Sequence, residues 1–283
     1  MSERRHLLNL AYRLTGSLAD AEDVVQEAYA RWYTLSRSQQ DAIANPAAWL
    51  TTVASRICLD LLGSARARRE RYVGAWIPEP LPTPATPTDP ADHVTLDESV
   101  SMAFLVVLDA MTPAERVAFI LHDVFRYPFT EIADIVGRTP LACRKLASSA
   151  RRRVRDSTPA TPPLSTQTLL VRRFKQAWES HDIEALIALL DPEATITADG
   201  GGQASSTQHP LHGHTQIAQY ATLLFRVMPR TTILERPVNG HPGLVIQQSN
   251  TTVTVMAFAT TPTHIKQIWA IRNPQKLQAW PPA

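Results

Sequence analysis

The chain contains little cysteine, which excludes two classes of protein. Cys58 and Cys143 are the only cysteines among 283 residues, and they lie far apart in the sequence. Two isolated thiols form neither a disulfide framework nor a CxxC metal site. We therefore exclude a small disulfide-stabilised domain and expect a protein of the reducing cytoplasm.

Long apolar runs are also missing. No uninterrupted apolar stretch approaches the ~18 residues of a membrane span, and the N-terminal residues MSERRHLLNL lack the apolar core of a signal peptide. Net charge is small too, because 28 Lys and Arg residues face 26 Asp and Glu residues, giving +2. The sequence predicts a soluble cytoplasmic protein without a membrane partner.

Proline, by contrast, is abundant and marks where the chain divides. The segment 76–92, WIPEPLPTPATPTDPAD, cannot form a helix and should be an extended spacer. A shorter segment of similar composition, DSTPATPPLS, covers 156–165. The predicted organisation is a first helical domain at 1–74, a linker at 75–95, a second helical domain at 96–156, a linker at 157–165 and a third domain at 166–283.

The strongest pattern lies in residues 129–155, which read as two helices with a sharp break. Gly137 supplies a helix stop, Thr139 an N-cap and Pro140 a first helical residue. A helix-turn-helix needs one apolar face for packing and one cationic face for a major groove. The predicted apolar stripe of the second helix is Ala142, Leu146, Ala150 and Val154.

Helix starts are also readable elsewhere in the first two domains. Ser17 and Asp20 resemble a capping box that opens a helix running to about Thr34, and Asn45 precedes a second helix that starts near Pro46. A further helix is expected near 96–110, and Thr112, Pro113 and Glu115 signal the start of the next. The apolar face of the helix after Ser17 is predicted to hold Val25, Ala28, Tyr29 and Trp32.

The third domain differs in character. Helices are expected at 166–180 and 183–190, followed by alternating runs rich in Thr and Val, with turns at Asn239–Gly240 and Pro242–Gly243. Helices followed by a meander of strands predict an α+β domain with a curved antiparallel sheet. The fold class is therefore multidomain: a helical bundle, a helix-turn-helix domain and a C-terminal α+β cone.

Three segments together resemble a known family. They are LAYRLTGSLADAEDVVQEAYARW, NPAAWLTTVASRICLDLLGSARARRERY and MTPAERVAFILHDVFRYPFTEIADIVGRTPLACRKLASSARRRV. Over about residues 6–155 the chain resembles regions 2 and 4 of extracytoplasmic-function (ECF) sigma factors. The tail resembles a SnoaL-like (NTF2-like) domain, as in sigma factors of the SigJ-like group.

Three short motifs strengthen this resemblance. The family patterns WLPEP, DGGGK and NPDKL read here WIPEP (76–80), DGGGQ (199–203) and NPQKL (273–277). Gln203 replaces the lysine of the family pattern and Gln275 replaces its aspartate, so this chain lacks the positive charge that the pattern has at position 203.

The resemblance implies a promoter-specificity factor that binds RNA polymerase core, through its β′ clamp and β flap, and promoter DNA. Region 2 should also open and read the −10 element, although Asn45 also fits an ordinary N-cap and Trp49 a core aromatic. The implied polymerase-binding residues are Asp20, Asp23, Gln26, Glu27 and Arg31. The implied −10 residues are Asn45, Trp49 and Arg56, and the implied −35 residues are Thr139, Leu141, Arg144, Lys145, Ser148, Arg151 and Arg152.

For the tail, the resemblance favours regulation of the same chain, and an unidentified small molecule is a candidate ligand of its cone. We expect the 199–203 loop and residues 273–277 to dock near residues 76–80, holding regions 2 and 4 too close together to span both promoter elements. The interdomain residues are Trp76, Pro78, Glu79, Pro80, Asp199, Gly200, Gly201, Gly202, Gln203, Asn273, Pro274 and Leu277.

Other interpretations remain open at this stage. The tail could be a SnoaL-like isomerase or cyclase fused to a DNA-binding module, or the chain could be a dimeric repressor. The acid–base candidates of such an enzyme are Asp199, Glu193, His209, His212 and His214. The spacing of His209, His212 and His214 resembles that of metal ligands, but no carboxylate pair or cysteine cluster accompanies it. The triple glycine lacks the Lys-Ser/Thr of a phosphate-binding loop. We predict no metal, no cofactor and no catalytic residue.

Overall fold

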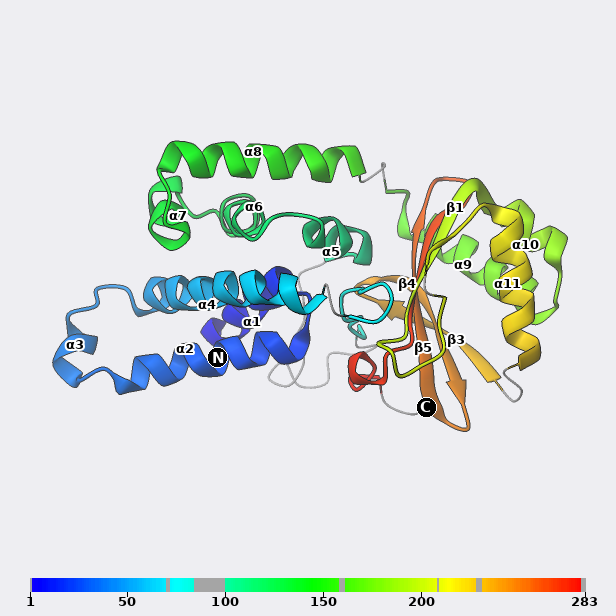
Figure 1. The fold of residues 1–283 in the computed structure, drawn as a ribbon, viewed down its shortest axis with the longest axis horizontal. Helices are drawn as coiled ribbons and strands as arrows, with labels where there is room; N and C mark the ends of the chain where they lie inside the picture. Colours follow the sequence, from blue (N-terminus) through cyan, green and yellow to red (C-terminus); the bar gives the residue numbers. More distant parts are fainter. Residues whose placement is uncertain are drawn as a thin grey trace. The chain divides into compact units, whose positions relative to one another are not determined.

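The computed structural model describes residues 2–69, 72–83, 100–157, 161–207, 209–227 and 231–280. These residues divide into two compact units, each built from distant parts of the sequence (Figure 1). The helical unit contains residues up to 69 together with 105–157. The sheet unit contains 72–83, 100–104 and the residues from 161 onward. Within the described residues, no helix has the length and apolar character that crossing a membrane requires.

The first part of the helical unit is a bundle of α1 (Ser2–Thr15), α2 (Leu18–Thr34), α3 (Arg37–Asp41) and α4 (Pro46–Arg69). Local capping explains where two of these helices start. The Ser17 hydroxyl accepts a hydrogen bond from the Asp20 amide at 3.2 Å, and the Asn45 carboxamide accepts one from the Ala48 amide at 3.1 Å. Both predicted helix starts are confirmed.

The second part consists of α5 (Met102–Asp109) from Leu105 onward, α6 (Pro113–Phe119), the π-helix η1 (Ile120–Val124), α7 (Phe129–Val136) and α8 (Pro140–Ser157). A reciprocal capping box between Thr112 and Glu115 opens α6. Gly137 ends α7 in the left-handed conformation at φ 68°, and the Thr139 hydroxyl caps α8. The predicted helix-turn-helix is therefore present.

The predicted apolar stripe of α8 is wrong by about one residue. Cys143, Ala147 and Ala150 are the buried side chains of this helix, whereas Leu146 and Val154 are only half-buried. A thiol packs as a small hydrophobe, so Cys143 takes the place that the pattern gave to Ala142. On α2 the buried residues are Ala21, Val24, Val25 and Ala28, so the predicted Tyr29 and Trp32 lie at the edge of the apolar face.

The two parts of the helical unit contact each other directly. Arg116 is 3% exposed, and its guanidinium donates to the Leu14 carbonyl at 2.8 Å and to the Asp109 carboxylate at 2.9 Å. Arg56 on α4 donates to the carbonyl of Asp134 on α7 at 3.0 Å. Residues 2–69 and 105–157 therefore form one packed helical body.

The sheet unit begins with α9 (Leu164–Glu179) and α10 (Ile183–Leu189), followed by β1 (Leu190–Asp199), β2 (Leu211–His212) and α11 (His214–Val227). Strands β3 (Thr231–Val238), β4 (His241–Gln248), β5 (Thr251–Thr260) and β6 (Ile265–Ile271) and the turn η2 (Pro274–Lys276) complete it. The strand order is β2-β1-β6-β5-β4-β3. Helices α9, α10 and α11 lie together on one side of this sheet (Figure 1), and a shared apolar core joins them to it.

The α+β class is confirmed, but three details of the prediction are wrong. Strands β1 and β6 pair in parallel, so the sheet is mixed rather than antiparallel. Helix α11 was not predicted at all. Asn239 and Gly240 form the expected turn, with φ of 51° and 76°, but Pro242 and Gly243 lie inside β4. Pro242 fits there because it is the second residue of its strand and lies before the β4–β5 ladder begins at Gly243.

The predicted proline-rich spacer is in part a packed element. Residues 72–83 belong to the sheet unit, where Ile77 is 1% and Leu81 5% exposed. The Leu81 amide donates to the Asn239 carboxamide oxygen at 3.1 Å, and Pro82 forms a bridge to Val238 at the end of β3. We call residues 72–83 the docked segment. The rest of the predicted spacer, 84–92, lies outside the described residues.

Candidate functional site

The carboxylate of Asp199 is the centre of a buried polar cluster in the sheet unit. Asp199 is the last residue of β1 and is 0% exposed. It accepts hydrogen bonds from the Tyr72 hydroxyl at 2.6 Å, the Ile77 amide at 3.0 Å and the Gly201 amide at 3.1 Å. The Lys276 ammonium lies 2.7 Å from its second oxygen. We call this set the Asp199 cluster.

Lys276 supplies the positive charge of this cluster. Its ammonium also donates to the Ile77 carbonyl and lies 4.2 Å from the centre of the Trp76 ring, an arrangement that favours a cation–π interaction. Asn273 donates to the Tyr72 hydroxyl at 2.8 Å. Burial and the neighbouring Asp199 raise the pKa of Tyr72, so its hydroxyl remains a neutral donor. A buried carboxylate therefore has a cation and three donors around it.

The three glycines after Asp199 are required by close approach of the chain. A Cβ on Gly200 would lie 2.2 Å from the Ala204 carbonyl, and one on Gly201 would lie 2.3 Å from the Asn273 carboxamide. Gly202 has φ 71° and would meet Val73 of the docked segment. These glycines shape the loop against the docked segment, which accounts for them without a phosphate.

Gln203, which stands where the family pattern has lysine, is exposed, and its amide donates to the Gly200 carbonyl. Since the cation on Asp199 comes from Lys276, the missing lysine leaves the buried ion pair intact.

Further contacts extend along the docked segment. Trp280 donates from its indole nitrogen to the Pro80 carbonyl at 2.8 Å and is 7% exposed. Among the remaining interdomain candidates, Pro78, Glu79 and Leu277 are buried, whereas Pro274 is exposed. The structure thus brings the three short motifs at 76–80, 199–203 and 273–277 together.

Sequence reasoning missed three residues of this site. Tyr72 contacts Asp199, Trp280 contacts the docked segment and Lys276 contacts both, yet none of the three was named as a site residue. Lys276 was covered only by the range 273–277 that was expected to dock. Lys276 could have been predicted, because it lies inside the NPQKL motif and a buried aspartate such as Asp199 needs a cation beside it. Tyr72 and Trp280 lie outside the motifs and carry no comparable signal.

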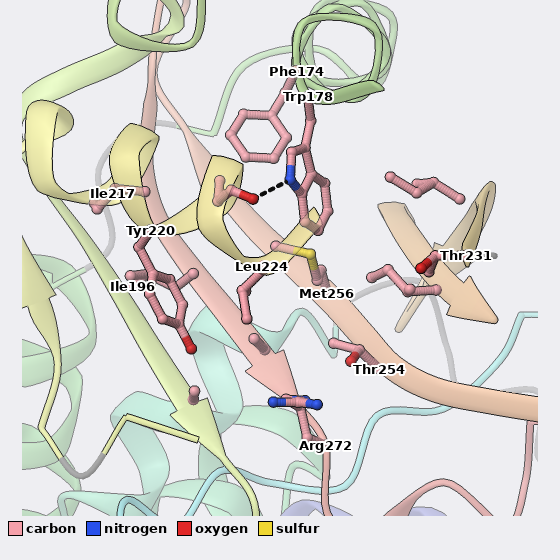
Figure 2. A pocket seen from close by; sticks show the side chains of 15 residues that line it. Phe174, Trp178, Ile196, Ile217, Tyr220, Leu224, Thr231, Thr254, Met256 and Arg272 are labelled. Atoms are coloured by element: carbon pink, nitrogen blue, oxygen red, sulfur yellow. Dashed lines mark hydrogen bonds between the residues drawn. The ribbon is translucent and has the colours of Figure 1, made fainter. Parts of the chain in front are cut away.

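A separate apolar pocket lies between α11, α9 and the sheet (Figure 2). Neither Asp199 nor Glu193 lines it, and no described lining residue is an aspartate, glutamate or histidine. His209 and His212 are exposed, and among the described residues no three His, Cys, Asp or Glu side chains gather as a metal site. The acid–base set considered from the sequence is therefore not assembled in the pocket.

The acidic face of α2 is open to solvent. Asp23, Gln26, Glu27 and Arg31 are exposed, and Asp20, whose amide donates to the capping Ser17 hydroxyl, is half-buried. Arg31 pairs with Glu27 at 2.8 Å, one turn away. This surface is negative with one neutralised pair, a pattern that suits a partner with complementary positive charge.

The three residues assigned to the −10 element have distinct environments. Asn45 is exposed and caps α4. Trp49 is half-buried, with its ring 5.3 Å from that of Trp32 in a T-shaped contact. The Arg56 guanidinium is held by the Asp134 carbonyl on α7. In this conformation Arg56 is therefore bound to the helix-turn-helix.

The residues assigned to the −35 element lie at the start and on the exposed side of α8. Leu141 is 62% exposed, and the Arg144 guanidinium lies 5.6 Å from the centre of the Phe129 ring. Arg151 forms two hydrogen bonds to Asp123, at 2.8 and 3.1 Å, which raise the pKa of its guanidinium. The remaining candidates, Thr139, Lys145, Ser148 and Arg152, are exposed.

Comparison with known proteins agrees with both units. Residues 1–68 match the family model for sigma-70 region 2, and residues 101–154 match that for sigma-70 region 4. The chain is 43% identical over 220 residues to the ECF RNA polymerase sigma factor SigJ of Mycobacterium tuberculosis, covering 77% of this chain and 69% of that protein. It is 33% identical over 279 residues to the probable ECF sigma factor SigI of the same species, covering 98% and 92%.

A solved structure extends the similarity to the whole chain. The crystal structure of the Mycobacterium tuberculosis ECF sigma factor SigJ superposes with a TM-score of 0.79 at 34% identity, covering 100% of this chain and 98% of that chain. The similarity therefore includes the C-terminal sheet as well as the two helical regions.

Proposed function

The chain belongs to the extracytoplasmic-function sigma factors, which direct RNA polymerase core to promoters, and we propose that its C-terminal domain restrains this activity through the docked segment. The observation that supports the proposal is the Asp199 cluster. Hydrogen bonds from the Tyr72 hydroxyl and the Ile77 amide to Asp199, and from the Lys276 ammonium to the Ile77 carbonyl, join the beginning of the linker between regions 2 and 4 to the C-terminal domain. The ion pair between Lys276 and Asp199 holds these C-terminal partners in place. We call this interaction the linker latch.

Chain connectivity explains how the latch can restrain the two promoter-binding regions. When the latch is closed, only residues 70–71 connect region 2 to the docked segment on the C-terminal domain. Residues 158–163 connect region 4 to the same domain. At about 3.5 Å per residue, these connections reach at most roughly 10 and 25 Å. With the linker released, Arg69 and Met102 could separate by up to roughly 115 Å.

The promoter elements need that reach. Elements centred near −10 and −35 are about 25 base pairs apart, or roughly 85 Å along the duplex at 3.4 Å per pair. In the helical unit, regions 2 and 4 are packed together through Arg116 and Arg56. The closed arrangement therefore disfavours simultaneous binding of both elements, and polymerase binding would select the open one.

The binding surfaces follow from exposure and charge. The acidic face of α2 (Asp20, Asp23, Gln26, Glu27 and Arg31) docks on the β′ clamp, and region 4 binds the β flap. The exposed side of α8 enters the −35 major groove, with Arg144 at a base edge and Arg152 at phosphate. Region 2 reads the −10 element with Asn45 and Trp49, and Arg56 tracks the freed strand once it leaves Asp134.

A catalytic role for the C-terminal domain fits the geometry less well. Among the described residues, the pocket wall carries no carboxylate or imidazole that could move a proton. Asp199 lies outside that wall and is already paired with Lys276. The fused enzyme considered from the sequence lacks an assembled acid–base residue, so a regulatory domain is the function that we propose.

Reconstituted transcription tests the latch. Asp199→Asn leaves Lys276 without its carboxylate partner and should open the linker, because a buried lysine without a counter-charge is unfavourable. We expect run-off transcription with RNA polymerase core to rise about fivefold or more, the range of ordinary coupling between sites. Glu193→Gln is the matched control, since it removes an exposed carboxylate from the same strand. Equal transcription by all three proteins would contradict the latch.

A further inference from the structure

The pocket of the C-terminal domain is apolar along most of its wall. Phe174, Trp178, Ile217, Leu224 and Met256 contribute from α9, α11 and β5 (Figure 2). The one polar atom of Trp178 already donates to the Ala221 carbonyl at 2.7 Å. This part of the wall therefore suits an apolar body and provides it with no polar contact.

Polar groups gather at the opposite end of the pocket. Figure 2 shows Arg272, Thr254 and the hydroxyl of Tyr220 there, away from Phe174 and Trp178. Burial raises the pKa of Tyr220, so its hydroxyl stays protonated, and the nearby charge of Arg272 partly opposes that shift. Among the described lining residues Arg272 is the only charged one. The pocket thus has one positive end and no negative group.

We propose that this pocket binds a small amphipathic carboxylate, with its apolar body against Phe174 and Trp178 and its carboxylate on Arg272 and Tyr220. A planar guanidinium binds a carboxylate with two parallel hydrogen bonds, and such charge-assisted bonds are stronger in a dry site. A neutral ligand would leave that gain unused, and a cationic one would be repelled. Arg272 also donates to the Ser205 carbonyl, but a guanidinium has five N–H donors and can bind both.

The same residue joins the pocket to the linker latch. The Arg272 amide donates to the Asp199 carbonyl at 2.7 Å, and its side chain holds Ser205 at the end of the glycine loop. A bound carboxylate competes with the Ser205 carbonyl for the orientation of the same guanidinium, so the Ser205 contact lengthens without being lost and the loop around the Asp199 cluster loosens. This second step rests on the proposed function, whereas binding itself does not.

Calorimetry with three matched probes tests the binding step on the full-length protein. Octanoate, 1-octanol and octylammonium share an eight-carbon tail and differ in charge. We expect octanoate to bind about tenfold more tightly than octanol, and octylammonium to bind most weakly. Arg272→Gln should abolish the preference for octanoate over octanol, and Arg272→Lys should keep part of it. Arg173→Gln, which removes an exposed arginine from α9 outside the pocket, should change nothing.

Two results would overturn the assignment: equal binding of octanoate and octanol to the wild-type protein, or an unchanged preference in Arg272→Gln. A thermal transition like that of the wild type shows that Arg272→Gln is folded, and Arg272→Lys gives a second, milder test.

Hydrogen exchange of the Ile77 amide tests the coupling separately, because this amide donates to Asp199. Saturating octanoate should speed its exchange at least threefold. Bound octanoate with unchanged exchange would overturn the coupling alone. Failure of the linker latch would instead show as wild-type transcription by Asp199→Asn, so the two proposals fail in different experiments.

Discussion

At the scale of single residues, the Asp199–Lys276 pair is a means of specifying one docked conformation. Two charges taken out of water gain little net stability, but removing either one leaves an unpaired buried charge, which costs about 3–5 kcal/mol. The pair is 0% exposed on the Asp199 side and 11% on the Lys276 side. Docking of residues 72–83 should therefore be sensitive to substitution of either residue, as the proposed latch requires.

Arg144 carries the prediction for promoter readout. Its guanidinium is exposed near the start of α8, above the Phe129 ring, where a recognition helix meets base edges. Arg144→Ala should cost roughly 1–3 kcal/mol at one position of the −35 element and flatten sequence preference there. A reporter series over −35 variants measures this. Arg152→Ala is the control and should weaken all variants alike, and a uniform loss with Arg144→Ala would contradict base readout.

His241 carries a prediction for pH dependence. Its Nδ1 donates to the Gln167 side-chain oxygen at 3.2 Å, and burial lowers the pKa of His241 below its usual value of 6.5. Because the pKa of this histidine is lower in the folded state, protons bind the unfolded chain first as the pH falls. Its contribution to stability is therefore present above about pH 6.5 and is lost below it. The free energy of unfolding of the C-terminal domain should therefore decrease below about pH 6.5.

The size of this effect is less than about 1 kcal/mol between pH 7.5 and 5.5, because His241 is partly exposed and water screens it. Urea unfolding at both pH values measures it, and His241→Asn should flatten the difference. An identical pH dependence in His241→Asn would assign the effect to other groups.

At the scale of elements, the sequence predicts what depends on local chemistry and fails where packing decides. Ser17, Asn45 and Thr139 act as caps because a side-chain oxygen and a nearby amide suffice. The buried face of α8 was predicted wrongly because Cys143 and Leu146 are both apolar, so the pattern alone does not show which of them is buried. Packing against α6 and α7 buries Cys143, and no local pattern reveals that packing. Pro242 signals a turn locally but lies at the start of a strand.

Two glycines of the helical unit should respond to alanine in opposite directions. Gly137 has φ 68° between α7 and α8, whereas Gly63 lies inside α4, and a Cβ would meet no atom within 4 Å at either position. Gly137→Ala should lower the free energy of unfolding by about 1 kcal/mol through backbone strain. Gly63→Ala should raise it by up to about 1 kcal/mol through helix propensity.

Urea unfolding of the helical unit followed by circular dichroism compares the two variants. The same sign for both would show that backbone conformation does not determine their effect.

At the scale of the whole molecule, non-local pairing limits what can be predicted. The parallel contact of β1 with β6 joins residues near 195 to residues near 267, and no local pattern reveals such a pair. Contact of residues 76–80 with 199–203 and 273–277 was expected from the family resemblance, in which the three corresponding motifs occur together. Tyr72 and Trp280, which complete the site, lie outside those motifs and had no such signal.

Energy transfer between labels on the two helical regions tests the closed arrangement. Dyes at Ala30→Cys on α2 and Asp156→Cys on α8 occupy exposed positions, and the native thiols Cys58 and Cys143 are 0% exposed. Adding Asp199→Asn should lower transfer efficiency, because an open latch lets regions 2 and 4 separate. Adding Glu193→Gln should leave it unchanged, and equal efficiency in all three would show that the latch does not govern their spacing.

The order of the latch along the chain has a consequence during synthesis. Tyr72 and Ile77 leave the ribosome long before Asp199 and Lys276, since 199 residues separate Ile77 from Lys276. At about 5–20 residues per second, the second half of the latch follows roughly 10–40 s later. Under the proposed restraint, regions 2 and 4 therefore emerge before the residues that restrain them, and the nascent chain passes through an interval without regulation.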